Sequence, residues 1–282
     1  MQKVKEGIMH AMFLICACVS ILAVVLICVY LFASGVPAIG EIGVTDFLFG
    51  TKWKPSSGYY GIFPMIIGSI LVTGIAVVIG VPIGILCAVF MSHYCPKKLY
   101  RFVKPAINLL AGIPSIVYGF FGLVVIVPIM KDLFGGSGKS LLTAGILLGI
   151  MILPTVIKTT ESSLNAVPKS YYEGALALGA THERSVFFAS LPAAKSGILA
   201  AIILGVGRAI GETMAVILVA GNQTIIPESI TSGIRTMTSN IVIEMGYAGG
   251  LHREALIATG VVLFVFILII NLCFSALKRR KD

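Results

Sequence analysis

The chain has 282 residues, of which 57% are hydrophobic and only 12% are charged, and its formal net charge is +9. Soluble globular proteins carry about 25% charged and about 45–50% apolar residues, so a soluble fold of this length cannot bury so much apolar surface. Hydrophobicity also excludes disorder, and six cysteines, most of them inside apolar runs, are too few for a secreted disulfide scaffold. The composition therefore predicts a polytopic helical membrane protein.

Six apolar stretches each supply close to the ~20 residues that a helix needs to cross a bilayer. They are Ala11–Ala33, Phe63–Met91, Pro105–Met130, Leu141–Ile157, Gly197–Ala220 and Ala255–Leu277. Runs such as Val261–Ile270 do not alternate between apolar and polar residues, which argues against a membrane β-barrel. We therefore expect an all-α fold with six transmembrane helices, of which the fourth is the shortest and can extend toward Glu161.

The first stretch follows Lys3 and Lys5, as the apolar region of a signal peptide would. Its apolar run is longer than the usual about 7–15 residues of such a region. We interpret it as a retained helix, with Ala33-Ser34-Gly35 as a weaker alternative cleavage site. The chain then divides into residues 1–62, with an N-terminal tail, the first span and an external loop, and residues 63–282, a core of five spans.

The positive charges predict the orientation in the membrane. With the N-terminus inside, 14 of the 20 Lys and Arg residues outside the spans fall on the cytoplasmic side, in line with the positive-inside rule. Basic residues next to the lipid bilayer explain most of the net charge without any nucleic acid partner. We therefore expect a multi-pass protein of the cell membrane with both termini in the cytoplasm.

The run Gly135-Gly136-Ser137-Gly138-Lys139-Ser140 is similar to the end of a phosphate-binding P-loop. The full motif requires a glycine at the position of Leu133, and no strand precedes the run. We interpret the run as a flexible external turn in which Ser140 caps the next helix. Because no nucleophile–base arrangement or metal-ligand spacing is recognisable, we expect neither enzymatic activity nor a cofactor in this chain.

The longest cytoplasmic segment, residues 158–196, predicts a helix–turn–helix hairpin. Ser170 is placed to cap the first helix, with Glu173 completing a capping box, and Gly179 is placed to end that helix in a left-handed conformation. A second short helix, Thr181–Ser190, follows and ends before Leu191-Pro192. From the residues alone, an ordinary amphipathic connection explains the pattern equally well.

The fifth stretch carries two charges inside the membrane. Arg208 is the twelfth of its 24 residues, and Glu212 follows one turn later on the same face of a continuous helix. A charge at this depth costs roughly 2.5–3.5 kcal/mol on insertion scales, so the pair must face a neighbouring helix or a wet cavity. A structural ion pair and a substrate pathway both explain it. We attribute the adjacent Gly207 and Gly211 to close helix packing.

Pro114 lies within the third stretch, where it removes a backbone donor and kinks or breaks the helix. A break at this point would expose the N-terminus of a half-helix beside Ser115, which suits an anion. A simple proline kink is at least as consistent with the residues.

The cytoplasmic segment contains a spaced motif that resembles the EAA loop of ABC importer permeases. The family's motif runs Glu-Ala-Ala, three residues, Gly, nine residues, Ile, one residue, Leu-Pro. This chain has Glu173-Gly174-Ala175, Gly179, Ala189 and Leu191-Pro192 at the matching positions, so that Gly174 and Ala189 depart from the pattern. The resemblance implies a type I ABC importer permease fold in which residues 158–196 form a coupling loop that docks onto an ATP-hydrolysing subunit.

Two further runs, AGIPSIVYGFFGL and GVGRAIGETMAV, resemble phosphate ABC importer permeases of the PstC type, and the likeness covers roughly Phe63 to the C-terminus. The resemblance implies that the chain helps to move inorganic phosphate inward. It implies as partners a homologous second permease, two ATPase subunits that bind ATP and Mg²⁺, and an external phosphate-binding protein. On the path Arg208 would attract the anion, Glu212 would hold the guanidinium and limit the time that the anion stays bound by repulsion, and Thr213 and Ser115 would donate hydroxyl hydrogen bonds.

Two other classes stay open at this point. A single-chain, ion-coupled secondary transporter would use Arg208 and Glu212 as a charge relay, although such proteins typically contain internal repeats and none is clear here. The second class that stays open is a non-transporting membrane scaffold. The long outer segment Gly221–Arg253 is expected either to contact the external receptor or to return toward the pathway.

Overall fold

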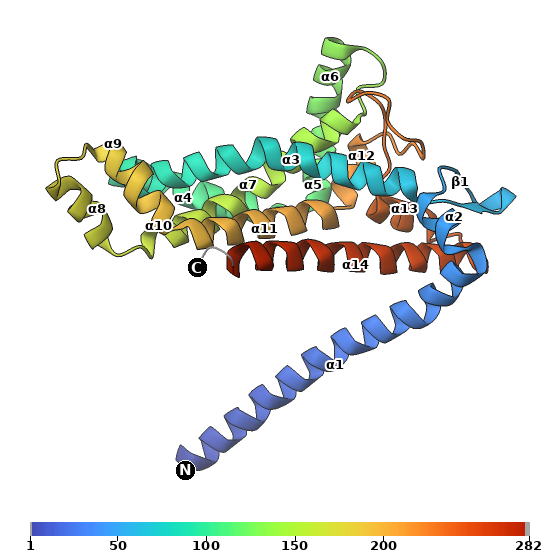
Figure 1. Cartoon of the computed structure of the whole chain (residues 1–282), viewed down its shortest axis with the longest axis horizontal. Helices are drawn as coiled ribbons and strands as arrows, with labels where there is room; N and C mark the ends of the chain where they lie inside the picture. The colour runs from blue at the N-terminus through green and yellow to red at the C-terminus, as the bar shows by residue number, and fades with distance from the viewer. Residues whose placement is uncertain (1, 280–282) are drawn as a thin grey trace.

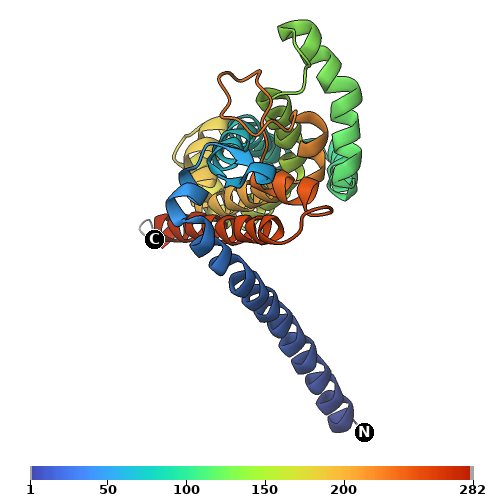
Figure 2. The ribbon, with the colours of Figure 1, turned by 90° about the vertical axis from the view of Figure 1, so that its right-hand side faces the viewer.

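The computed structural model describes residues 2–279 of the chain. Met1 of the predicted tail and residues 280–282 of the predicted basic C-terminal end lie outside the described residues. Four long helices run alongside one another as a bundle (Figures 1 and 2). They are α3 (Phe63–Val89), α7 (Leu141–Asn165), α11 (Lys195–Gly211) and α14 (Leu251–Arg279).

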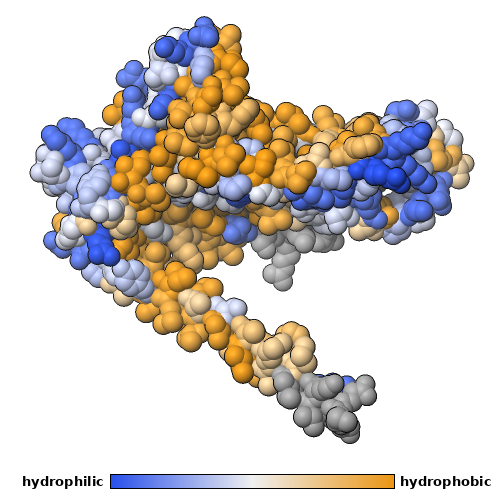
Figure 3. All heavy atoms as spheres, turned by 180° about the vertical axis from the view of Figure 1, so that it is seen from behind, coloured by the Kyte–Doolittle hydropathy of each residue, from blue (hydrophilic) through white to orange (hydrophobic). Residues whose placement is uncertain are grey.

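The described part contains five helices that are long and apolar enough to cross a membrane. A sixth joins them if two helical segments bent by 70°, His182–Ala193 and Lys195–Gly211, count as one span. Hydrophobic side chains cover the middle of the bundle and hydrophilic ones gather at its two ends, as a bilayer requires (Figure 3). The predicted all-α membrane fold is confirmed.

Helix α7 is the centre of the bundle, because 67% of its most apolar window is buried inside the chain. α3 approaches it closely: a Cβ atom at Gly80 of α3 would lie 2.7 Å from the carbonyl oxygen of Gly149, so only glycine fits there. As predicted, Ser140 caps the start of α7, and its Oγ accepts a hydrogen bond from the Thr143 N–H at 3.2 Å. The helix continues to Asn165, well beyond the predicted end at Ile157.

The first span is part of α1 (Gln2–Ile42), which leaves the bundle at the end that carries the strands (Figures 1 and 2). We call this the outer end, because the predicted orientation places it outside the cell. Its C-terminal part packs against α14, where the Phe32 and Phe264 rings meet edge to face at 5.8 Å. The most apolar window of α1, in contrast, has none of its residues buried inside the chain. The long apolar helix is confirmed, and its apolar surface is left for lipid or another chain.

The predicted third span, Pro105–Met130, is wrong as one continuous helix. The structure has α4 (Lys97–Gly112), α5 (Ser115–Phe121), a π-helical segment (Gly122–Ile126) and α6 (Val127–Phe134). Ile113 and Pro114 between them have extended ψ angles of 126° and 143°, because a proline disfavours the helical conformation of the residue before it. The apolar span is therefore Ser115–Phe134, and its end, α6, points away from the bundle (Figure 1).

A buried carboxylate holds α4 against α7. Glu161 of α7 is only 1% exposed, accepts a hydrogen bond from the Tyr100 hydroxyl at 2.6 Å and forms an ion pair with Lys104. Both partners belong to α4. We call this group of three residues the inner clamp.

The predicted fifth span, Gly197–Ala220, is also interrupted. α11 ends at Gly211, Glu212 adopts an extended ψ of 131°, and the short helix α12 (Met214–Val219) follows. No proline causes this break. Among the described residues, two of the six predicted spans are therefore broken, one at Ile113–Pro114 and one at Glu212–Thr213.

The predicted helical hairpin is present at the end of the bundle opposite the strands (Figure 1). It consists of α8 (Lys169–Ala177), α9 (His182–Ser185), a π-helical segment (Val186–Ser190) and α10 (Leu191–Ala193). A further π-helical segment, Phe90–Tyr94, extends α3 toward it.

The outer end carries smaller elements. α2 (Val44–Phe49) leads to an antiparallel pair of two-residue strands, β1 (Trp53–Lys54) and β2 (Tyr59–Tyr60), in which Trp53 faces Tyr60. A 3₁₀ turn, Pro55–Ser57, and Gly58 at φ +76° connect the strands. The last outer element is α13 (Met237–Glu244), which precedes α14.

Candidate functional site

The two broken spans lie side by side in the bundle. Helix α5, which follows the first break, packs against α12, which follows the second: a Cβ atom at Gly119 would lie 2.8 Å from the Cα of Ala215. The Tyr118 hydroxyl reaches back across the first break and donates a hydrogen bond to the Leu110 carbonyl at 2.7 Å. The prediction of a true break at Pro114 is confirmed over that of a simple kink.

Arg208 lies in the last turn of α11 and is half-buried. Its Nη1 donates a hydrogen bond to Thr155 Oγ1 of α7 at 3.2 Å. The guanidinium therefore lies between α11 and α7, one turn before the second break. Sequence reasoning missed Thr155, although a hydroxyl directly after Pro154 in the fourth span is a signal for a polar contact in a membrane helix.

Glu212 does not pair with Arg208 as predicted. Its Oε1 accepts hydrogen bonds from the backbone N–H groups of Thr213 and Ala215 at 3.1 and 3.3 Å. The ion pairs among the described residues do not include Arg208 or Glu212. The expected pair required a continuous helix, and the chain breaks at Glu212, so its carboxylate caps the next half-helix instead.

The two predicted hydroxyl residues lie at the two breaks. Ser115 is the first residue of α5 and is half-buried. Thr213 precedes α12, and its hydroxyl donates to the Gly211 carbonyl at 3.2 Å. Gly207 and Gly211 have no atom near the place of a Cβ, so the packing predicted for them does not occur within the described part of this chain. That face of α11 is open.

The segment between α12 and α14 packs back against the bundle, as one of the two predictions made for it requires, and the contact with an external receptor stays a prediction. The Thr238 hydroxyl, in the first turn of α13, donates a hydrogen bond to the backbone carbonyl of Glu212 at 3.2 Å. The N–H of Met237 donates to Ser69 Oγ of α3 at 3.0 Å. Sequence reasoning could not place these residues, because the segment is polar and has no helical periodicity.

The helical hairpin forms around Gly179, which has the predicted left-handed conformation with φ of +83°. The predicted capping box is wrong: Pro168 occupies the N-cap position of α8, so Ser170 lies inside the helix and does not cap it. Thr181 caps the second helix, and the Tyr172 hydroxyl hydrogen-bonds His182 Nδ1 at 2.6 Å, which joins the two helices. Leu178 at the tip is 91% exposed.

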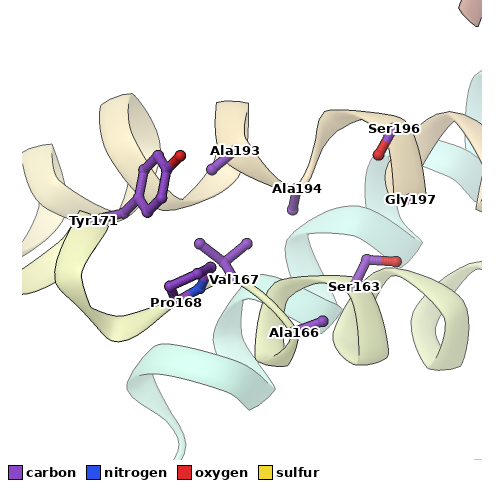
Figure 4. A pocket seen from close by; sticks show the side chains of 9 residues that line it. All are labelled: Ser163, Ala166, Val167, Pro168, Tyr171, Ala193, Ala194, Ser196 and Gly197. Atoms are coloured by element: carbon purple, nitrogen blue, oxygen red, sulfur yellow. The ribbon is translucent and has the colours of Figure 1, made fainter. Parts of the chain in front are cut away.

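The residues of the EAA-like motif divide between the tip and the base of the hairpin. Glu173, Gly174 and Gly179 are exposed on α8 and the turn, and Ala175 is half-buried. The second helix continues past its predicted end at Ser190, through Leu191-Pro192 to Ala193. At the base lies an open pocket of about 360 Å³, in which Tyr171 of α8 and Ala193 of α10 lie above the linker residues Val167 and Pro168 (Figure 4).

A bundle of membrane-spanning helices with two broken spans and a projecting helical hairpin is the fold of a membrane permease subunit. The sequence profile of one family, described as "Binding-protein-dependent transport system inner membrane component", matches residues 80–282. The chain belongs to this family.

Known relatives match along most of the chain. It is 39% identical over 277 residues to the "Probable ABC transporter permease protein YqgH" of Bacillus subtilis (strain 168), which covers 94% of this chain and 89% of that protein. It is 37% identical over 240 residues to the "Phosphate transport system permease protein PstC" of Haemophilus influenzae, with 78% and 76% covered. The PstC of Mesorhizobium japonicum is 34% identical over 277 residues, with 91% and 84% covered.

Solved structures share the fold. A chain of the MetNI methionine ABC transporter has a TM-score of 0.65 at 21% identity and covers 82% of this chain and 100% of its own. A chain of a bacterial ABC transporter that imports the acidic polysaccharide alginate has a TM-score of 0.65 at 15% identity, with 99% of both covered. The predicted type I ABC importer permease fold is confirmed. The alternative of a single-chain secondary transporter, with Arg208 and Glu212 as a charge relay, is wrong.

Proposed function

We propose that this chain is one of two homologous transmembrane subunits of an ATP-driven importer that moves inorganic phosphate into the cytoplasm. The observation that carries the proposal is Arg208, which lies one turn before the break at Glu212 and binds a neutral hydroxyl. Because no carboxylate of the described residues pairs with it, its charge is available to an anion. Relatives at 34–37% identity are named phosphate transport permeases, which supports phosphate over other oxyanions.

Phosphate crosses a bilayer only along a path that replaces its hydration water. A unit charge pair at ~4 Å in an effective dielectric near 20 is worth ~4 kcal/mol, which lowers a barrier without forming a deep trap. Arg208 supplies that attraction. Ser115 and Thr213 are the hydroxyl donors at the two breaks, with Thr155 as a third hydroxyl on the guanidinium.

One of the two roles predicted for Glu212, that of holding the guanidinium, is replaced by another. Its carboxylate keeps α12 capped, and so it preserves the break beside Arg208. It also places a negative charge just outside Arg208, which limits the time that an anion stays bound.

The helical hairpin is the coupling element. Glu173, Gly174, Ala175 and Gly179 offer a docking surface of small and exposed residues to an ATPase subunit. Leu191-Pro192 connects that surface to α11 and Arg208. ATP and Mg²⁺ are bound by two such ATPase subunits, and an external phosphate-binding protein delivers the anion. In this arrangement the hairpin and both termini are cytoplasmic.

The pathway is tested by removing both charges at once. In Arg208→Gln with Glu212→Gln, the glutamine at 208 keeps a donor for Thr155, and the one at 212 keeps an acceptor for α12. We expect normal assembly of the complex and a loss of labelled phosphate uptake of at least about tenfold, because the ~4 kcal/mol attraction is gone. Arg208→Lys, which keeps the charge and loses the planar fork, is expected to retain partial uptake.

The matched control is Arg253→Gln, which removes an exposed outer arginine of α14 and should leave uptake unchanged. Uptake is measured in competition with sulfate and molybdate, so that the preferred anion is identified in the same assay. Robust phosphate uptake by the double variant would contradict the role of Arg208.

The coupling element is tested at Gly179. A tryptophan there is strained by the φ of +83° and adds bulk at the tip of the hairpin. Gly179→Trp should reduce co-purification of the ATPase or uncouple ATP hydrolysis from uptake. Gly136→Trp introduces the same residue at a similar φ of +69° in the exposed turn before α7, and so controls for strain alone. Equal ATPase recovery and uptake in both variants would overturn the docking role.

A further inference from the structure

The second part of the segment between α12 and α14, from Ser232 to Glu244, is anchored inside the bundle. The N–H of Ile234 donates to the Ala220 carbonyl at 2.8 Å, and the Ser232 carbonyl accepts from the Leu141 N–H at 2.9 Å. Ile234 and Met237 are fully buried. These contacts fix the segment between α12, α7 and α3, on the outer side of the second break.

The first turn of α13 is the part that reaches the break. Thr236 caps this helix, with its Oγ1 accepting from the Ser239 N–H at 3.2 Å. Thr238 then contacts the Glu212 carbonyl, and Ser239 is fully buried. Since α11 runs outward from Lys195 to Gly211 in the proposed orientation, α13 lies outside Arg208.

One carboxylate fastens the other end of α13. Glu244, whose side chain is 9% exposed, accepts hydrogen bonds from Trp53 Nε1 at 2.9 Å and His252 Nε2 at 2.8 Å, and it forms an ion pair with Arg235. These donors come from β1, α14 and the returning segment. We call the four residues Trp53, Arg235, Glu244 and His252 the outer clamp.

Two buried polar atoms near Arg235 have no hydrogen-bond partner among the described residues. Its Nη1 also binds Asn240 Oδ1 at 3.0 Å, and its Nε donates to the Asn222 carbonyl at 3.1 Å. The two atoms are the side-chain nitrogen of Asn240 and the side-chain oxygen of Asn222. Buried polar groups in native structures are paired with protein groups or with ordered water. These two atoms therefore mark positions beside Arg235 at which a further hydrogen-bond partner fits.

We propose that α13 closes the anion pathway on its outer side, and that Glu244 is the positioning residue that holds it closed. The inference rests on the proposed function, because it takes the break beside Arg208 as the pathway. Opening requires the Thr238 contact with Glu212 to separate and α13 to withdraw outward.

The outer clamp also connects the exposed strands β1 and β2 to α13, through the hydrogen bond between Trp53 and Glu244. Trp53 is itself buried, and its strand pair exposes Lys54 and Tyr59 on the outside. A protein that moves this pair of strands pulls on the Trp53–Glu244 hydrogen bond. An external partner that binds these strands can therefore release the closure by α13.

The test measures how fast a buried residue of α13 reacts from outside. Ser239→Cys is introduced into the full complex after the six native cysteines are replaced by alanine, and it is exposed to a membrane-impermeant maleimide without ATP or binding protein. Glu244→Gln in this background should raise the labelling rate about tenfold or more, because a hydrogen-bonded charge is lost from the clamp. Glu254→Gln, at an exposed carboxylate of α14, is the matched control and should leave the rate unchanged.

A second reporter separates opening from unfolding. Thr259→Cys lies fully buried in α14 and should stay unlabelled in every variant. If Glu244→Gln does not assemble, Trp53→Phe removes a single donor and should give a smaller increase at position 239. Labelling equal to the parent, or labelling of both reporters together, overturns the closure. The labelling does not depend on the transported anion, so a failure of phosphate uptake in the parent would refute the proposed function and leave this result standing.

Discussion

The two breaks differ in how the chain makes them. At Pro114 the backbone itself is the cause, since proline lacks an N–H and the Tyr118 hydroxyl satisfies the exposed Leu110 carbonyl across the gap. At Glu212 there is no proline, and a side-chain carboxylate takes over the two N–H groups that the break leaves free. One break is fixed by covalent structure and the other by a replaceable side chain. The second is therefore the one that can form and dissolve, and it is also the one that α13 contacts.

The largest effect is expected from removing the covalent break. In Pro114→Ala the backbone regains a donor, so α4 and α5 are free to join as one helix and the N-terminus at Ser115 is lost. We expect phosphate uptake to fall by more than about tenfold, because the site loses its geometry. The assay is uptake per assembled complex.

Pro105→Ala is the control for this change, because Pro105 lies inside α4 without interrupting it. It should behave like the parent. Equal uptake by Pro114→Ala would show that the first break is dispensable and that only the second matters.

The next effect is expected at the carboxylate that forms the second break. Glu212→Ala leaves the Thr213 and Ala215 N–H groups without their acceptor, which costs about 0.5–2 kcal/mol as for other lost helix caps. We expect uptake to fall several-fold. Glu212→Gln keeps an acceptor oxygen and should be milder than both Glu212→Ala and Arg208→Gln. If the glutamine variant is as impaired as the alanine variant, the charge matters and the cap does not.

The smallest effect is expected from acid on the outer clamp. Burial acts to raise the pKa of Glu244, but hydrogen bonds from Trp53, His252 and Arg235 outweigh it, so the pKa lies below its ordinary value. A carboxylate with a lowered folded-state pKa contributes stability that is present above its unfolded pKa, about 4.5, and is lost as the pH falls through the folded value.

Labelling of Ser239→Cys should therefore stay slow when the external pH falls from 7 to about 5, and it should rise only in stronger acid. The measurement is the labelling rate at each pH, divided by that of an exposed cysteine at Ser57→Cys, with Thr259→Cys as the reporter of unfolding. A rise already near pH 6 would mean that another group holds α13.

The sequence contains strong signals for part of this structure and weak ones for the rest. Apolar runs of span length, Pro114 and Gly179 act through local backbone physics, so their positions could be predicted. The break at Glu212 depends on a side chain that accepts hydrogen bonds from the backbone that follows it. In the sequence alone, the spacing of Arg208 and Glu212 is equally consistent with an ion pair on a continuous helix. The hydrogen bond between Thr238 and Glu212 joins residues that are 26 positions apart, and no local sequence pattern predicts it.

The cap at the start of α8 shows the same limit on a small scale. Ser170 and Glu173 have the spacing of a capping box, but Pro168 already supplies an extended residue where the helix begins. The helix therefore starts two residues earlier than the motif requires, and the motif has no free N–H groups to bind.

The inner clamp bears on how the protein is made. Lys104 leaves the ribosome 57 residues before Glu161, and its helix α4 carries too many polar residues to enter lipid readily without a partner. Glu161, in turn, would be an uncompensated buried charge if α7 settled without α4. Neither helix is stable in its final place alone. Biogenesis must therefore keep α4 near the membrane surface until α7 has been synthesised, so that the two helices enter their final positions as a pair.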